Sequence, residues 1–135
     1  NRSWIYKEGK HRDVYALETL ATFLDFSFDP HSLNERRAKV AYVRGFFDAE
    51  GGIPKSDKSR FYIQLVQKDK EKLETLACIL SSFGIKTGKI HNPSAQVDPH
   101  YWRLFVSTRS HKQFASIVGS WHPRKQAIFT RRMEI

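Results

Sequence analysis

From residue 32 onward the sequence predicts an α+β fold in the order α-β-β-α-β-β-α, followed by a short final helix. Segments with apolar residues at helical spacing are separated by segments in which apolar and polar residues alternate. The length of 135 residues suits one modest core. Strand pairs between helices favour an antiparallel sheet with helices on one face and the other face free.

The first 31 residues are expected to form a helical extension to this domain, which then occupies residues 32–135. Apolar residues in the segment 13–25 recur at the spacing of a short helix, namely at Val14, Leu17, Leu20, Ala21 and Leu24. Pro30 then interrupts the helical pattern, because proline cannot continue a helix interior.

The first helix of the domain is expected to run from about Glu35 to Ala49. Ser32 and Glu35 form a capping-box pattern, in which the serine oxygen accepts from the backbone and the glutamate reaches back. The Gly51–Gly52 pair should end the helix, since glycine is the preferred residue just after a helix.

The remaining elements follow from alternation and from turn residues. A strand and turn region is expected at 53–60, and residues 61–67 alternate in the manner of a half-buried strand. A second helix should run over 69–83, with Asp69 as its cap and Gly84 as its stop. The last elements expected are strands at 85–91 and 100–106, a helix from Ser110 and a helix from Pro123.

The positive charge lies in the second part of the chain. The net charge is +9, yet residues 1–50 carry eight basic and eight acidic side chains, so the whole excess falls in 51–135. Such an excess indicates a polyanion partner, either nucleic acid or an acidic membrane. No run approaches the roughly 18 apolar residues of a membrane span, and we expect no membrane partner.

Cysteine usage and the N-terminus indicate the compartment. Cys78 is the single cysteine, which excludes an internal disulfide framework and a cysteine-rich zinc site. The first ten residues are polar and mixed, unlike a secretory signal. We therefore expect an intracellular protein, in the cytoplasm, nucleoid or an organelle, that is not secreted.

The helix expected at 35–49 carries a stripe of small residues. Ala41, Gly45 and Ala49 recur every four residues and lie on one face. Small residues at this spacing let another helix approach closely. Glycine inside a helix costs about 1 kcal/mol relative to alanine, so a packing role is plausible for Gly45. The natural partner is the same helix of a second copy, which predicts a two-fold homodimer.

Two acids occupy the last turn of this helix, where the helix dipole disfavours them. Asp48 and Glu50 each lose about 0.3–1 kcal/mol in that position. Two-fold pairing would bring two copies of Glu50 near the axis, where hard oxygen ligands suit Mg²⁺. Carboxylates with a divalent metal beside a phosphate favour phosphodiester hydrolysis. The alternative is that both acids are simply solvated.

Residues 42–51, Tyr-Val-Arg-Gly-Phe-Phe-Asp-Ala-Glu-Gly, resemble the LAGLIDADG motif of a family of homing endonucleases. The resemblance implies a saddle-shaped antiparallel sheet set on double-stranded DNA, homodimers paired through the motif helices, and frequent coding within introns or inteins. It also implies that Glu50 binds Mg²⁺ or Mn²⁺, and we add the Gly51 backbone carbonyl as a ligand. Phe46 and Phe47 are expected to face the subunit's own core.

The same resemblance implies two further catalytic residues. Gln67, at the end of an expected strand, resembles the glutamine that organises active-site waters in the family. Lys125 resembles the basic residue beside the scissile phosphate, with Arg124 as the alternative. Glu71 stands where the family often has another basic residue. For Gln67 and Lys125 the alternative is an ordinary surface position.

The free face of the sheet is expected to contact DNA. Arginine and glutamine can bind the edges of guanine and adenine, and lysines mostly bind phosphates. Strand alternation and the position of the first turn give these candidates: Lys55, Ser56, Lys58, Arg60, Tyr62, Gln64, Lys89, His91, Tyr101 and Arg103.

Other functions remain open on the sequence alone. His91–Asn92 lacks a second histidine at metal-ligand spacing, which disfavours a His-Asn-His nuclease, and no nucleophile-elbow pattern for a serine hydrolase is present. The stronger alternative is a non-catalytic DNA-binding regulator or an RNA intron maturase on the same scaffold. The chain could also be one half of a longer protein with two motifs.

Overall fold

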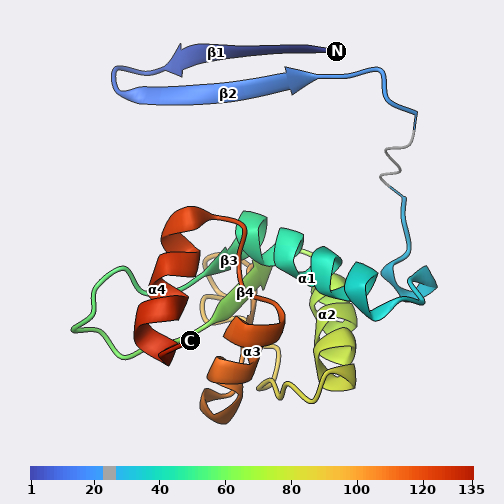
Figure 1. Cartoon of the computed structure of the whole chain (residues 1–135), viewed down its shortest axis with the longest axis vertical. Helices are drawn as coiled ribbons and strands as arrows, with labels where there is room; N and C mark the ends of the chain where they lie inside the picture. Colours follow the sequence, from blue (N-terminus) through green and yellow to red (C-terminus); the bar gives the residue numbers. More distant parts are fainter. Residues whose placement is uncertain (23–26) are drawn as a thin grey trace.

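The computed structural model describes residues 1–22 and 27–135, which form an N-terminal hairpin and an α+β domain (Figure 1). Short 3-10 turns at Pro30–Ser32 and Thr108–Ser110 lead into the first and third helices of the domain. The elements of the domain are α1 (Arg36–Glu50), β3 (Gly51–Gly52), β4 (Gln64–Gln67), α2 (Lys70–Ser82), β5 (Trp102–Phe105), α3 (His111–Ile117) and α4 (Pro123–Met133).

The sheet of the domain is antiparallel and has β4 at its centre, with β3 and β5 on either side. Leu65 lies opposite Gly51 in one pair and opposite Leu104 in the other. The α+β class and the antiparallel sheet predicted from the sequence are therefore confirmed. In the parts of the chain that the structure describes, no helix combines the length and apolar character needed to cross a bilayer.

One face of the sheet is buried under the helices and forms the core. Leu65 and Leu104 are fully buried, whereas Gln64 and Arg103 beside them are partly exposed, as period-two alternation requires. Phe47 of α1 meets Phe114 of α3 and Phe129 of α4, with ring centroids 5.3 Å and 5.7 Å away. Phe47 faces the core as expected, and Phe46 packs half-buried against it.

The strands are shorter than the alternation predicted. β3 contains only two residues, and β4 begins at Gln64 rather than at residue 61. Pro54 has no N–H to donate to a ladder, and the Asp57 and Ser59 carbonyls accept from the Arg132 side chain instead of from a strand. The segment 85–91 forms only two isolated bridges, from Thr87 to Val106 and from His91 to Arg103.

The helix starts were predicted with mixed success. Asp69 caps α2 as expected, because its Oδ1 accepts from the Glu71 N–H at 3.0 Å. The capping box at Ser32 is wrong: α1 starts at Arg36 with no side-chain cap, and the Ser32 hydroxyl donates to the Asp29 carbonyl. Asp29 instead caps the preceding 3-10 turn by accepting from the His31 N–H. Polar side chains near a helix start compete for the same backbone groups, and here these hydrogen bonds form one turn before α1.

The N-terminal extension is a β-hairpin rather than a helix. β1 (Arg2–Glu8) pairs with β2 (Arg12–Glu18) through a turn in which Gly9 adopts a positive φ of 68°. The helix predicted over 13–25 is therefore wrong for residues 13–18, and its residues 23–25 lie outside the described residues. The prediction failed because helical spacing within 13–25 takes no account of β1, the strand with which residues 12–18 pair. Aromatic and β-branched residues in β2 also favour a strand.

Candidate functional site

Glu50 is the last residue of α1, and its side chain is exposed. The helix ends there because Gly51 turns into extended backbone, with φ −101° and ψ 160°. A Cβ at Gly51 would overlap the Phe47 ring and lie 2.6 Å from the Phe47 carbonyl oxygen. Only glycine therefore fits directly after Glu50, and this steric requirement holds the carboxylate at the junction of α1 and the sheet.

Asp48 has a different role from Glu50. Its Oδ1 accepts a short hydrogen bond from the Ser120 hydroxyl, and its Oδ2 accepts from the Trp121 N–H at 2.9 Å. The two acids of the last turn are therefore not equivalent. Asp48 fastens the loop before α4 to α1, and Glu50 is left exposed, with no ion pair among the described residues.

Lys125 of α4 points at the C-terminal end of α1. Its Nζ donates to the carbonyls of Phe47 at 3.0 Å, Asp48 at 3.1 Å and Gly51 at 3.0 Å, and it lies 4.6 Å from the centre of the Phe47 ring. An ammonium has three donors, and all three are used. A cation here also compensates the negative end of the helix dipole. Burial lowers the pKa of Lys125, nearby Asp48 opposes this, and Arg124 adds to it.

The structure thus brings Glu50, Gly51 and Lys125 together, although Lys125 contacts backbone carbonyls rather than facing outward. Gln67 ends β4, two residues beyond the partner of Gly51, or about 7 Å along the strand. Its Oε1 accepts from the Lys68 N–H at 2.8 Å. Arg124 is exposed. The roles of Gln67 and Lys125 in catalysis stay predictions.

The small-residue stripe of α1 is partly covered by Trp121. Ala49 is exposed and Ala41 and Gly45 are half-buried, and a Cβ added at Gly45 would lie 3.8 Å from the Trp121 ring. The guanidinium of Arg44 lies 4.9 Å from the centre of that ring, which is itself 60% exposed. Trp121 and Arg44 were missed from the sequence, since 76 positions separate Trp121 from Gly45.

The outer face of the sheet carries rings as well as polar groups. Phe105 lies 6.1 Å from the Tyr62 ring and 5.8 Å from the His91 ring, measured between ring centroids. Arg103 and Tyr101 adjoin this group, with the Arg103 guanidinium near the rings of both Tyr101 and Phe105. Phe105 was not among the predicted contact residues, although it shares the strand face of Tyr101 and Arg103. Gln64 lies beside Gly52 on the same sheet.

The loop between β3 and β4 is held by the C-terminal helix. Asp57 Oδ1 accepts from Arg131 Nη2 at 2.7 Å and from Nε at 3.2 Å. Arg132 Nη1 and Nη2 donate to the carbonyls of Asp57 at 2.7 Å and Ser59 at 2.9 Å. Lys55, Ser56, Lys58 and Lys89 are exposed. Lys58 belongs to this loop, so strand alternation does not set its direction as predicted.

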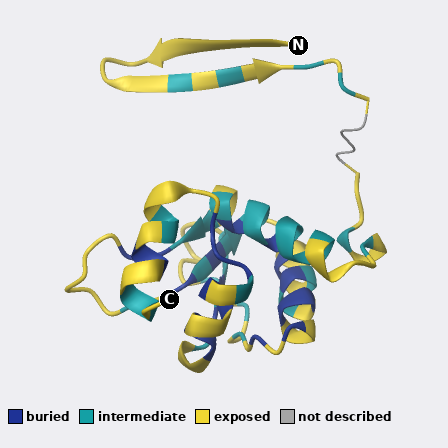
Figure 2. Cartoon of the chain, in the orientation of Figure 1, coloured by how far each residue is buried: buried dark blue, intermediate teal, exposed yellow. Residues whose placement is uncertain are grey.

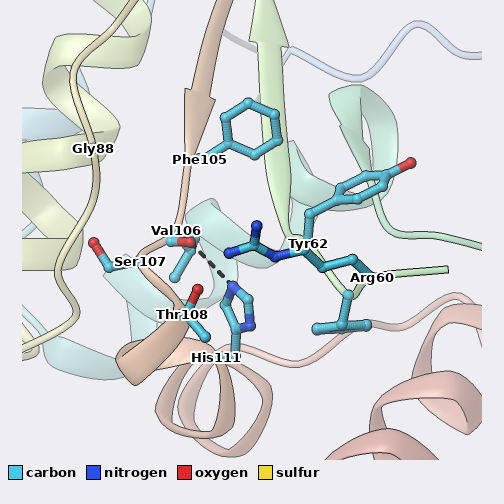
Figure 3. A pocket seen from close by; sticks show the side chains of 9 residues that line it. Arg60, Tyr62, Gly88, Phe105, Val106, Ser107, Thr108 and His111 are labelled. Carbon is cyan, nitrogen blue, oxygen red and sulfur yellow. Dashed lines mark hydrogen bonds between the residues drawn. The ribbon is translucent and has the colours of Figure 1, made fainter.

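Arg60 lies outside β4 as well, and it borders a cavity of about 430 Å³ (Figure 3). Figure 3 shows its side chain reaching towards His111, below Phe105. The His111 ring is buried, its Nε2 lies 3.1 Å from the Val106 carbonyl, and it packs edge-on against Phe61. Burial lowers the pKa of His111, the Val106 bond opposes this, and the charge of Arg60 adds to it.

Residues 37–119, which contain α1 and the sheet, match the model of the LAGLIDADG-like domain family. The chain belongs to this family. It is 31% identical to the homing endonuclease I-ApeI of Aeropyrum pernix, over 92% of this chain and 61% of that protein. The chain therefore spans about three fifths of the length of this curated relative.

Solved structures of I-DmoI share the fold of this LAGLIDADG-like domain. The structure of I-DmoI with DNA and Ca matches at a TM-score of 0.56 and 25% identity, over 71% of this chain and 49% of that chain. Its structure with DNA and Mn matches at a TM-score of 0.53 and 25% identity, over 66% and 46%. The matched part thus corresponds to slightly less than half of the I-DmoI chain.

The donor set at the end of α1 fits a hard divalent cation. Among residues 1–22 and 27–135, no group of three or more histidine, cysteine or acidic side chains converges to form a complete cage. Mg²⁺ does not need one, because it keeps several waters and usually takes one or two carboxylates together with phosphate oxygens. The exposed Glu50 carboxylate and the adjacent Gly51 carbonyl are the oxygen donors of this kind.

Proposed function

We propose that this LAGLIDADG-like domain is a site-specific DNA endonuclease that hydrolyses both strands of a long, near-palindromic duplex site as a homodimer. The observation that carries the proposal is that the Glu50 side chain is exposed and forms no ion pair among the described residues. The Asp48 carboxylate accepts hydrogen bonds from Ser120 and Trp121, whereas the Glu50 carboxylate is exposed next to Gly51 at the junction with the sheet. Residues 32–135 form the nuclease domain, and residues 1–31 form an extension to it.

Glu50 and the Gly51 carbonyl would hold Mg²⁺ or Mn²⁺. When bound, such an ion supplies a lowered water pKa and neutralises charge that develops on the phosphate. A carbonyl oxygen has two lone pairs, so Gly51 can accept from Lys125 and still offer an electron pair. Lys125 holds the three carbonyls of this turn in place, and Gln67, at the end of β4, is proposed to orient solvent.

A second copy of the chain is proposed to pack against α1. The small residues Ala41, Gly45 and Ala49 favour a close helix approach, and Trp121, which partly covers this stripe and is itself exposed, would form part of the same contact surface. The I-DmoI chains are about twice as long as the matched part, which leaves room in them for a second unit of similar size. A two-fold pair would provide one Glu50 for each DNA strand.

The outer sheet face and the β3–β4 loop are proposed to bind duplex DNA. The whole positive excess of the chain lies in residues 51–135, which contain these elements. Lys55, Lys58 and Lys89 suit phosphates, while Gln64, His91 and Arg103 lie on or beside the strands, where base edges would be reached.

The test starts by selecting bound sites from a randomised duplex library in Ca²⁺, followed by addition of Mg²⁺. We expect double-strand cuts by the wild-type protein and a cutting rate at least about 100-fold lower for Glu50→Gln. Mutating even a residue that only contacts a metal ligand lowers metal affinity or activity about 10–100-fold. Glu74→Gln makes the same change at another exposed helical acid and should cut normally.

Other outcomes separate the alternatives. Tight duplex binding without cutting by either protein would contradict the catalytic proposal and support a DNA-binding regulator. Selection of no duplex site, with retention of structured RNA, would support the maturase function. A sedimentation mass near 15.8 kDa, rather than twice that value, for the DNA-bound protein component would contradict the homodimer.

A further inference from the structure

Arg103 occupies an interior position on the outer face of the sheet. Its N–H donates to the His91 carbonyl at 2.8 Å, its carbonyl accepts from the His91 N–H at 3.0 Å, and on the other side it lies opposite Val66 of β4. The next residue, Leu104, is fully buried in the core. Alternation therefore directs the Arg103 side chain to the outer face, with backbone on both sides of it.

The guanidinium of Arg103 is held by its neighbours. Its Nη2 donates to the Tyr101 hydroxyl at 3.2 Å, and its central carbon lies 5.4 Å from the centre of the Tyr101 ring and 5.7 Å from that of Phe105. Phe105 is in turn packed by Tyr62 and His91. Rings near a guanidinium attract it and restrict its rotamers. The guanidinium of Arg103 is therefore held in its orientation before any ligand binds.

The charge of Arg103 has no partner of opposite sign. Arg131 and Arg132 are paired with Asp57, and Arg2 with Glu18, but no ion pair among the described residues includes Arg103. Its Nε is buried and is the one such side-chain atom in the described residues without a hydrogen-bond partner. Because this Nε is buried, a ligand can be bound only through the Nη groups of Arg103.

A guanine edge fits this arrangement best. With Nε buried and one Nη2 proton on Tyr101, the donors that remain are on Nη1 and Nη2, which form a planar pair. Guanine offers two acceptors, O6 and N7, in the major groove, and arginine binds them bidentately. Phosphates lie at the rims of the groove, whereas Arg103 lies in the interior of the sheet face, between β4 and the bridge at His91.

We propose that Arg103 is a specificity-determining residue that selects one guanine in each half-site of the DNA. This inference rests on the proposed function, because it requires a duplex bound against the outer sheet face. Lysine can also donate to guanine, but an ammonium is a point charge without two fixed donors, so it should select guanine less strictly than arginine.

The experiment repeats the duplex selection in Ca²⁺ with the wild type, Arg103→Lys, Arg103→Gln and the control Lys58→Gln. We expect the wild type to prefer guanine about tenfold or more at one position per half-site. Arg103→Gln should lose that preference, Arg103→Lys should weaken it, and both variants should keep the others. Lys58→Gln, in the exposed loop, should weaken binding to all sites and leave every preference intact.

The selected guanine is then replaced by 7-deazaguanine, which lacks N7. Wild-type affinity should fall about tenfold, and Arg103→Gln affinity should not change. Unchanged preferences in both Arg103 variants, with normal melting curves, would overturn the inference while leaving the endonuclease proposal standing. A uniform loss of affinity in Arg103→Gln, recovered by Arg103→Lys, would also overturn it and assign a phosphate contact. Selection of no duplex by the wild type would overturn both proposals.

Discussion

The hairpin and the domain of this chain are stabilised in different ways. Every residue of β1 and β2 is exposed or half-buried, and Trp4, Ile5, Tyr6, Tyr15 and Leu17 remain largely accessible (Figure 2). The domain buries eighteen apolar residues in one core. A two-stranded ribbon is marginal in water without further packing, so the hairpin is held by local pairing and the domain by long-range contacts.

The two regions also use charge differently. Three cross-strand or turn ion pairs neutralise the hairpin: Arg2 with Glu18, Lys7 with Asp13, and Arg12 with Glu8. In the domain, Lys125 is satisfied by carbonyls and Arg103 by rings, and neither has an acid as a direct partner. The domain does pair Asp57 with Arg131 and Arg132, so the difference from the hairpin concerns Lys125 and Arg103, whose positive charges have no acidic partner in direct contact.

The largest difference is expected from aromatic truncation in the two regions. Phe47→Ala removes a fully buried ring in contact with two others and should lower the free energy of unfolding by about 3–5 kcal/mol. Trp4→Ala removes a ring from the hairpin surface and should change the domain's free energy by no more than about 0.5 kcal/mol. Urea denaturation followed by circular dichroism measures both, and similar losses would contradict the comparison.

Lysine replacement sharpens the comparison at a smaller scale. Lys125→Met removes one donor from each of three carbonyls at the end of α1, of which Phe47 keeps the Gly51 N–H, and should cost about 1–3 kcal/mol. Lys7→Met breaks an exposed ion pair with Asp13 and should cost less than about 1 kcal/mol. The same denaturation curves give both values, and a Lys125→Met protein as stable as Lys7→Met would refute the capping role of Lys125.

Alanine at two glycines should act with opposite signs. Gly45 lies within α1, so Gly45→Ala should stabilise the isolated domain by up to about 1 kcal/mol while weakening the proposed dimer. Gly9 has a φ of 68°, so Gly9→Ala should destabilise the hairpin by about 1 kcal/mol and leave dimerisation unchanged. Thermal unfolding and sedimentation equilibrium separate the effects. A tighter Gly45→Ala dimer would contradict the packing model.

The smallest effect is expected from histidine titration. Because burial lowers the pKa of folded His111, the folded protein disfavours the protonated ring. Stability from neutral His111 is therefore fully present above the unfolded pKa of about 6.5 and is lost as the pH falls through the folded value. His111→Gln should flatten this acidic loss, whereas His11→Gln in the exposed turn should not. Melting temperatures between pH 7 and pH 4 provide the comparison.

Local sequence patterns predicted the elements whose determinants lie within a few residues. The helix with Gly45, its end at Gly51, the Asp69 cap and the inward direction of Leu65 and Leu104 all follow from such patterns, and the structure has them. The start of α1 failed because Asp29 and Ser32 interact one turn earlier than the capping box requires.

Contacts between distant residues could not be predicted in this way. The hairpin depends on β1 as the partner of β2. The spacing of apolar residues within 13–25 gives no information about that partner. The contacts of Lys125 with carbonyls join residues 74–78 positions apart. The contact of Arg131 with the Asp57 carboxylate spans 74 positions. The family motif drew attention to Glu50, but the different surroundings of Glu50 and Asp48 follow only from the packing of the loop at Ser120.

The most direct test of the central claim is to locate the divalent ion on the DNA-bound protein. Fe²⁺ replaces Mg²⁺, and ascorbate with peroxide then cleaves the polypeptide beside the bound ion. The account predicts a cut near residues 50–52 that Mg²⁺ suppresses, that Glu50→Gln abolishes and that Glu74→Gln retains. A cut elsewhere, or one that persists in Glu50→Gln, would contradict the assignment of the metal site to the end of α1.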